Sequence, residues 1–385
     1  MGELPGKLRE KLEKRKEDDA LRELPVDNDL IDFSSNDYLG LGRSKEIYHR
    51  ASEILEECNL VFNGAGGSRL LTGNHDLYAM AEKPLAEFHN SETALIFNSG
   101  YDANMGFFSS VPQRGDLIFY DELIHASIRH GITTCHARSY RFKHNDSEDL
   151  KRKVEMFFDM KPRDGVEVYV VTESVYSMDG DSPDLQAFAT ICKMHDLRLV
   201  VDEAHATGVI GYMGRGLVQY QSAEHDVFAR LVTFGKAIGC HGAAILCDNS
   251  LRQYLINFAR PFIYTTALPP HTVATIIAAY EYLASAEEEQ GKLQANITHF
   301  KSLCREKGLK DYFIESDSAI HCCLIKGNEN VKEVSRNLRD AGFDVLPILS
   351  PTVSEGSERL RFCLHSFNKQ DEIEKVVELM SKFIL

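Results

Sequence analysis

The chain contains 385 residues, of which 43% are apolar and 26% charged, and 58 acidic against 43 basic side chains give a net charge of −15. The apolar fraction excludes an intrinsically disordered chain, and a content of 26 glycines and 11 prolines excludes a collagen-like one. An acidic surface repels the phosphate backbone, so nucleic acid is not expected as a partner.

Two further features concern location and cysteine chemistry. No apolar stretch reaches about 18 residues, so we expect neither a membrane-spanning helix nor a membrane partner. The charged first residues lack the apolar core of a signal peptide and carry too many acids for a transit peptide, which predicts a cytoplasmic protein. Nine cysteines without C-x-x-C spacing predict reduced thiols, with no metal site and no disulfide framework.

The first predicted element is a charged amphipathic helix over residues 3–23, with its leucines near one stripe. A short extended segment follows at 30–33. From about residue 60 to 265, short apolar runs alternate with helical stretches. Several runs are apolar throughout rather than alternating, as expected for strands that helices cover on both faces, which predicts a mainly parallel α/β sheet. The predicted strands are 94–97, 117–120, 166–172, 197–202, 231–234 and 243–247.

The C-terminal part has a different pattern. A long helical stretch at 272–303, interrupted near Gly291, leads into a small α+β domain. Its predicted strands and helices are 321–325, 331–341, 343–346, 359–364 and 371–383. We therefore expect an N-terminal helix and extension at 1–59, a large domain at 60–270, and a linking helix with a small domain at 271–385.

Polar clusters follow four of the predicted strands, at residues 98–101, 173–181, 202–205 and 233–236. In an open α/β sheet, ligands bind beyond the carboxyl ends of the strands, so these clusters are expected to converge. The first precedes a helix, whose N-terminal N–H groups would cradle a phosphate. The others supply a lysine that can form a Schiff base, a carboxylate to face a ring nitrogen, and an imidazole. Together they predict a pyridoxal phosphate site.

Nine motifs in order extend this interpretation to nearly the whole chain from Ala20 onward. Together they resemble the α-oxoamine synthase family of fold-type I pyridoxal phosphate enzymes, which implies a large domain with a mainly parallel sheet of about seven strands. The motifs are FSSNDYLGL (33–41), GAGGSRLLTGNHDLY (64–78), NSGYDAN (98–104), HAS (125–127), ESVYSMDGD (173–181), VDEAHATGVIG (201–211), VTFGKAIGCHGAA (232–244), FIYTTALPP (262–270) and SPTVSEGSERLRF (350–362).

The resemblance implies the roles of the site residues. Lys236 is the expected cofactor-linked lysine and Asp202 the partner of the ring nitrogen, while His125 stacks on the ring and reaches the substrate. Thr265 or Thr266 is expected to reach the phosphate from a second subunit. The residues expected to hold the cofactor are Gly100, Tyr101, His125, Ser177, Asp202, His205, Thr233, Lys236, Thr265 and Thr266.

Substrate contacts are implied in the same way. Asn36 and Arg361 are expected to face the amino-acid carboxylate, although neighbouring Arg359 competes for the role of Arg361. Arg22 and Thr352 are expected toward the acyl group. The chain departs from the family between Leu24 and Phe33, where relatives carry a longer β-hairpin.

The activity implied by the resemblance is the decarboxylative condensation of an amino acid with an acyl thioester by a homodimer. We expect L-alanine with pimeloyl-CoA or a pimeloyl carrier protein, because Leu70 and Leu71 could line an apolar channel. A sister activity that joins glycine to acetyl-CoA stays open. A cofactor-free scaffold subunit is the non-enzymatic alternative, and the presence of Lys236, Asp202 and His125 argues against it.

Overall fold

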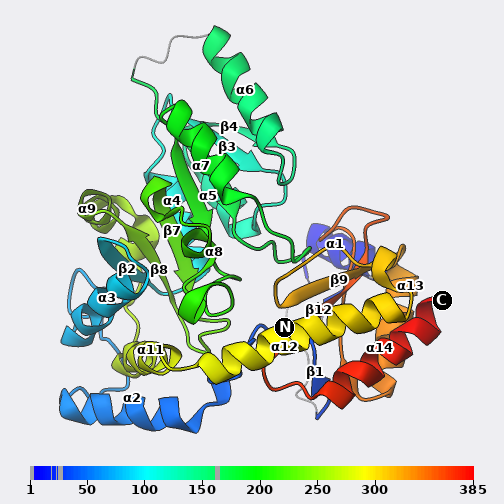
Figure 1. Ribbon diagram of the computed structural model, residues 1–385. Coiled ribbons are helices and arrows are strands. Elements are labelled where there is room, and N and C mark those ends of the chain that lie inside the picture. The colour runs from blue at the N-terminus through cyan, green and yellow to red at the C-terminus, as the bar shows by residue number, and fades with distance from the viewer. Residues whose placement is uncertain (1–3, 19, 23, 25–28, 161–164) are drawn as a thin grey trace. The chain divides into compact units, whose positions relative to one another are not determined.

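The computed structural model describes residues 4–18, 20–22, 24, 29–160 and 165–385 (Figure 1). It divides into two compact units. The sheet unit contains residues 36–177 and 181–293, and the C-terminal unit contains 294–385 with 178–180 and the described residues up to 35. The boundaries expected from the sequence stay a prediction.

A seven-stranded sheet with the order β2-β8-β7-β6-β5-β3-β4 forms the centre of the sheet unit (Figure 1). β8 is antiparallel to β2 and β7 and the other four neighbouring pairs are parallel, so the expected mainly parallel sheet is confirmed. Every side chain of β5 is buried, as its continuous apolar run predicts. The strands are β2 (Thr93–Phe97), β3 (Leu117–Asp121), β4 (Arg138–Phe142), β5 (Val168–Glu173), β6 (Arg198–Asp202), β7 (Val227–Thr233) and β8 (Ala243–Cys247).

Helices cover this sheet and build its core. Phe107 of α4 and Ile128 of α5 pack with Val171, Leu231 and Ile245 of the strands. The helices of the unit are α2 (Lys45–Glu57), α3 (Asp76–Phe88), α4 (Gly100–Ser110), α5 (Ala126–Thr134), α6 (Ser147–Met160), α7 (Leu185–Met194), α8 (Leu217–Tyr220), α9 (Asn249–Phe258), α10 (Arg260–Ile263) and α11 (Pro270–Leu283), with 3-10 turns η1 (Leu41–Arg43), η2 (Tyr212–Gly214) and η3 (Glu224–Asp226).

The C-terminal unit is built on a small antiparallel sheet with the order β11-β12-β9, and a separate parallel pair joins β1 to β10. Its elements are α1 (Gly6–Glu17), β1 (Ile31–Asp32), η4 (Lys310–Tyr312), β9 (Ile320–Leu324), α13 (Asn328–Asp340), β10 (Phe343–Asp344), β11 (Leu346–Ile348), β12 (Arg359–Cys363) and α14 (Gln370–Ile384). The long helix α12 (Glu287–Glu306) begins in the sheet unit and ends in this one.

Two helix predictions need correction. The interruption expected near Gly291 is wrong, because α11 ends at Leu283 and Gly291 lies inside α12, where no atom crowds the position of a Cβ. The N-terminal helix is shorter than residues 3–23 and buries none of its side chains.

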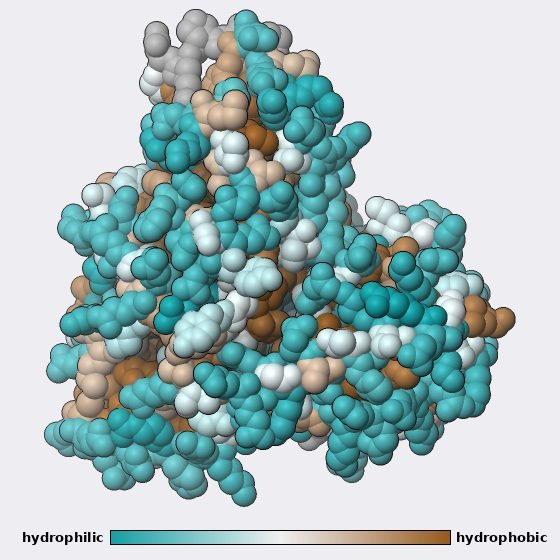
Figure 2. Space-filling view, viewed as in Figure 1, coloured by the Kyte–Doolittle hydropathy of each residue, from teal (hydrophilic) through white to brown (hydrophobic). Residues whose placement is uncertain are grey.

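The surface agrees with the composition. The face drawn in Figure 2 is mainly hydrophilic, with apolar side chains in limited patches. Within the described ranges, no helix combines the length and apolar character that crossing a bilayer requires.

Candidate functional site

Lys236 lies in the loop 234–242 that joins the antiparallel strands β7 and β8. Its Nζ is 2.6 Å from Nε2 of buried His205. The Nδ1 of His205 is 2.7 Å from the Tyr38 hydroxyl, which donates to Oδ1 of Asn36 at 3.1 Å. Because the hydroxyl proton goes to Asn36, the hydroxyl oxygen accepts from Nδ1–H. We therefore assign Nε2 as the acceptor that holds the lysine amine.

Asp202 is the last residue of β6, and its side chain is buried and fixed by two donors. Its Oδ1 accepts from the backbone N–H of Ala204 at 2.9 Å, and its Oδ2 accepts from Nδ2 of Asn104 at 2.9 Å. The same Nδ2 donates to Oγ of Ser127 at 3.0 Å, and that hydroxyl is 2.7 Å from Nδ1 of His125. One amide group thus orients both the carboxylate and the imidazole.

His125 is held as a neutral imidazole. Burial lowers its pKa below the ordinary value, although the Asp202 carboxylate raises it, and the Lys236 charge lowers it further. The backbone N–H of Ser127 donates to Nδ1, so the ring proton resides on Nε2. The backbone N–H of His125 donates to Glu173, whose pKa burial and the Asp202 charge raise well above its usual range.

An N-terminal helix nest adjoins the lysine loop. Gly100 begins α4, and Ser99 caps this helix by accepting from the N–H of Asp102 at 3.1 Å. A Cβ on Gly100 would lie 3.6 Å from Oγ1 of Thr233, which also accepts from the N–H of Gly235 at 3.4 Å. The start of α4 and the end of β7 are therefore close enough to share one phosphate.

The threonine pair lies beside this nest in the same chain. Nδ2 of Asn98 donates to Oγ1 of Thr265 at 3.1 Å and to the carbonyl of Thr266 at 2.7 Å. One of these threonines is expected from the sequence to reach the phosphate from a second subunit, and that role stays a prediction. Tyr101 is 46% exposed, and its hydroxyl is 2.6 Å from Nδ1 of His130.

The chemical groups gathered at this site fit pyridoxal phosphate. An amine suits the aldehyde carbon, a buried carboxylate suits a protonated ring nitrogen, and the N–H groups of a helix terminus suit the phosphate. Lys236, Asp202 and Gly100 supply them from the strand ends and the nest.

The remaining predicted residues lie in other segments of the chain. Ser177 is half-buried in the loop after β5. Arg22, Thr352 and Arg361 belong to the C-terminal unit, the first two exposed and Arg361 buried on β12. The guanidinium of Arg359 is bound by the carboxylate of Asp179 and by the carbonyl of Met178 at 2.8 Å. The role expected of Arg361 stays a prediction.

Sequence reasoning missed four residues that position the predicted ones. Tyr38 and Ser127 bond the two site histidines, Asn104 bonds Asp202, and Glu173 accepts from the His125 backbone. Each of the four lies inside one of the nine motifs, so the sequence marked these residues but did not indicate what they do.

Comparison with known proteins gives consistent results. The family described as aminotransferase class I and II matches residues 28–379. A curated relative from Emericella nidulans, named 8-amino-7-oxononanoate synthase, is 39% identical and covers 98% of this chain and 95% of the relative. The crystal structure of 8-amino-7-oxononanoate synthase from Francisella tularensis is 31% identical, with a TM-score of 0.77 over 92% of this chain and 98% of that one. A structure of serine palmitoyltransferase with PLP is 28% identical, with a TM-score of 0.85 over 92% and 87% of the two chains.

Proposed function

The chain belongs to the aminotransferase class I and II family and, within it, to the α-oxoamine synthases, and we propose that it makes 8-amino-7-oxononanoate for biotin biosynthesis. As a pyridoxal phosphate-dependent acyltransferase, it would condense L-alanine with a pimeloyl thioester and release CO₂ and the free thiol. The observation that carries the proposal is the Asp202–Asn104–Ser127–His125 network in a chain similar over 98% of its length to a relative of that name.

The residues divide the chemistry among themselves. When bound, pyridoxal phosphate supplies an electron sink for the carbanion at the amino-acid Cα. The Nζ of Lys236 removes the α-proton and returns a proton after CO₂ is lost. Asp202 would hold the protonated ring nitrogen of the bound cofactor. Neutral His125 offers its Nε2–H to an oxygen of the reacting acyl group, a role that its bonds to Ser127 preserve.

Substrate contacts and assembly are part of the proposal. Asn36 and Arg361 would bind the alanine carboxylate, Arg22 and Thr352 would lie toward the acyl chain, and Ser177 would contact the cofactor ring. We place the enzyme in the cytoplasm as a homodimer. Exposed apolar residues support the dimer, because subunit interfaces bury such surface. They include Val61 (70% exposed), Phe62 (60%), Leu70 (49%), Leu71 (80%) and Tyr264 (77%).

A thiol-release assay tests the substrate assignment. The purified holoenzyme is offered glycine, serine or alanine with acetyl-, palmitoyl- or pimeloyl-CoA, and with a pimeloyl carrier protein. Preference for alanine with a pimeloyl donor is expected. A preference for glycine with acetyl-CoA would replace the proposed activity with the sister one. Activity with no pair would favour the scaffold alternative.

The role of Lys236 has its own test. Borohydride reduction should fix the cofactor to Lys236, as peptide mass mapping can show. Lys236→Ala should abolish both the label and thiol release, whereas Lys326→Ala, on the C-terminal unit, should change neither. A label on another lysine would contradict the assignment.

A further inference from the structure

The helix α1 belongs to the C-terminal unit, and none of its side chains is buried. Isolated helices shorter than about 15 residues are marginal in water, and a helix in a protein is normally stabilised by covering its apolar side. Two leucines of α1 are nevertheless exposed, Leu8 to 48% and Leu12 to 47%. Because they are four residues apart, they lie on the same side of the helix. This side therefore offers apolar contacts that a partner can cover.

Cations alternate with these leucines on the same side of α1. They are also spaced by four residues, and each of the last two follows a leucine by three, so leucines and cations form one continuous surface. This surface, called the basic stripe below, consists of Lys7, Leu8, Lys11, Leu12 and Arg15. The acids of α1 form a row on the opposite side, at Glu10, Glu13 and Glu17. In a chain with a net charge of −15, the basic stripe is a local site for an acidic partner.

The basic stripe borders a cavity of the same unit, with a volume of about 840 Å³. The residues that line this cavity include Lys11, Arg15, Ala20, Ser350 and Pro351. Arg22 and Thr352, which are expected toward the acyl chain, are within two residues of this lining in the sequence. Carboxylates line the cavity as well, at Asp18, Glu355 and Glu358, so the excess of positive charge lies on the stripe and not inside the cavity. A partner bound to the stripe would therefore sit at the rim of a cavity next to residues expected to meet the acyl group.

We propose that the basic stripe docks an acidic acyl carrier protein that delivers the acyl group, an inference that rests on the proposed function. Carboxylates of the carrier protein pair with the cations of the stripe, and apolar side chains between them contact Leu8 and Leu12. Complementary charge of this kind speeds encounter and selects the partner. A lipid surface would require a wider apolar face than two leucines provide. A second copy of the chain fits less well, because lysine is depleted in the centre of subunit interfaces.

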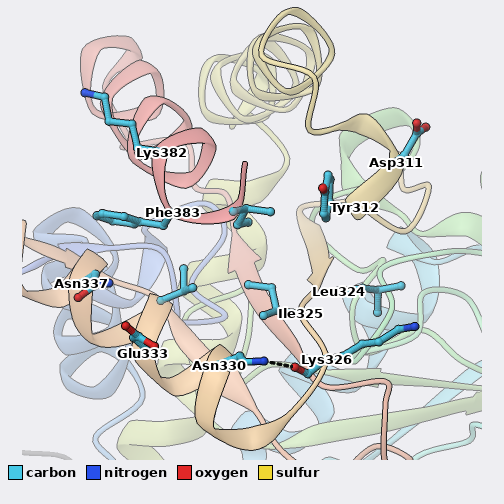
Figure 3. Close-up of a pocket in the computed structure, with 12 residues that line it drawn as sticks. Asp311, Tyr312, Leu324, Ile325, Lys326, Asn330, Glu333, Asn337, Lys382 and Phe383 are labelled. Carbon is cyan, nitrogen blue, oxygen red and sulfur yellow. Dashed lines mark hydrogen bonds between the residues drawn. The ribbon is translucent and has the colours of Figure 1, made fainter.

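Another cavity of the C-terminal unit supplies the control surface (Figure 3). Its volume is about 790 Å³, and it shares no lining residue with the cavity beside the stripe. Lys326 and Lys382 line it together with the carboxylates of Asp311 and Glu333. Replacing these two lysines removes the same charge as replacing two lysines of the basic stripe, and it leaves the stripe untouched.

Titration of a fluorescently labelled pimeloyl carrier protein with the holoenzyme, followed by anisotropy, tests the docking directly. The Kd of the wild type should rise with salt concentration, because the charges that pair are exposed. Lys7→Gln with Lys11→Gln should raise the Kd by about fivefold. Lys326→Gln with Lys382→Gln should bind like the wild type at every salt concentration. An equal Kd for the two variants, or binding to phosphatidylglycerol vesicles without binding to the carrier protein, would overturn the proposal.

The leucines and the assembly state provide two further checks. Leu8→Gln with Leu12→Gln, both at exposed positions, should also raise the Kd, whereas a purely electrostatic surface would keep it unchanged. Sedimentation should give the same oligomeric state for the wild type and for every variant. A change of oligomeric state in the stripe variants would assign α1 to a contact between subunits and would refute the docking.

Kinetics with two donors separate this proposal from the proposed function. Lys7→Gln with Lys11→Gln should raise the KM for the pimeloyl carrier protein by about fivefold, while the KM for pimeloyl-CoA stays unchanged, because CoA lacks the acidic protein surface. Use of pimeloyl-CoA but not of the carrier protein would overturn the docking and leave the proposed function intact. If neither donor is used, the proposed function fails, and the binding titration, which needs no turnover, still decides the docking.

Discussion

The amide of Asn104 shows what the residue scale adds to a motif. Asp202 could be predicted because it ends a strand at the edge where ligands bind, and His125 because its motif resembles that of the family. Asn104 lies within α4, where a single asparagine looks like an ordinary helical position. Only its two donated hydrogen bonds, to Asp202 and Ser127, reveal that it orients the carboxylate and the imidazole together.

Asn104→Leu tests this role. The variant keeps the branched shape of the side chain but removes both donors, so Asp202 loses a charge-assisted hydrogen bond worth about 1.5–3 kcal/mol. We expect the exchange of the alanine α-proton with D₂O, followed by NMR, to slow by about 10- to 100-fold. Rescue by Asn104→Gln to a partial rate would fit a positioning role.

Asn257 provides the control for that experiment. It is exposed on α9, and its amide donates to the Gln253 carbonyl at 2.8 Å. Asn257→Leu should exchange at the wild-type rate. Wild-type exchange in Asn104→Leu would show that the amide supports the fold alone.

Adjacent acids illustrate the element scale. Asp202 ends β6 and Glu203 follows directly, and the sequence alone does not show that the two carboxylates have different surroundings. The structure separates them. Glu203 is fully buried and accepts from Nε and Nη2 of Arg230 on β7 at 2.9 and 2.6 Å. Arg230 also donates to the His89 carbonyl at 2.7 Å. The pair links two neighbouring strands, which no local sequence pattern could indicate.

Arg230→Met should be strongly destabilising. It leaves the Glu203 carboxylate buried without its partner, which costs about 3–5 kcal/mol of unfolding free energy in urea titrations. Arg198→Met is the matched variant, because Arg198 on β6 pairs with Glu167 where the side chains are 37% and 49% exposed. Its loss should stay below about 1 kcal/mol. Similar losses in the two variants would contradict a stabilising role of the buried pair.

Element boundaries show where local reasoning fails. The strand β4 was not predicted, because four of its five side chains are exposed and its sequence RSYRF has no buried alternation. The buried strands β5 and β8 were predicted to within two residues, since a continuous apolar run suffices for a strand that helices cover.

At the scale of the whole molecule, buried histidines couple stability to pH. His89 and His321 are both fully buried and neutral, and burial is the main cause of their lowered pKa values. His144 is the opposite case. Although burial lowers its pKa, the hydrogen bonds that its ring donates to the carboxylates of Asp121 and Asp181 raise the pKa to about 10. The sequence alone does not indicate whether a histidine pKa is raised or lowered, because the direction depends on the partners that the fold supplies.

The signs follow from linkage. Below pH 6.5, His89 and His321 take up a proton in the unfolded chain but not in the folded chain. Both histidines therefore lower the free energy of unfolding as pH falls. The contribution of His144 is complete below pH 6.5 and is lost as pH rises toward 10. Buried Cys192 and Cys322, whose pKa values burial raises to about 12, add a loss above pH 9.

His321→Phe isolates one of these contributions. The variant cannot take up the proton that His321 gains on unfolding, so its stability should fall less steeply on acidification than that of the wild type. The unfolding free energy of the variant minus that of the wild type should increase by about 1.4 kcal/mol for each pH unit below 6.5. Urea titrations of both holoenzymes at pH 7.5, 6.5 and 5.5 measure this shift, and groups common to both proteins cancel in the comparison. A difference that stays constant across these pH values would mean that His321 takes up its proton in the folded chain as readily as in the unfolded one, against the neutral ring that its burial imposes.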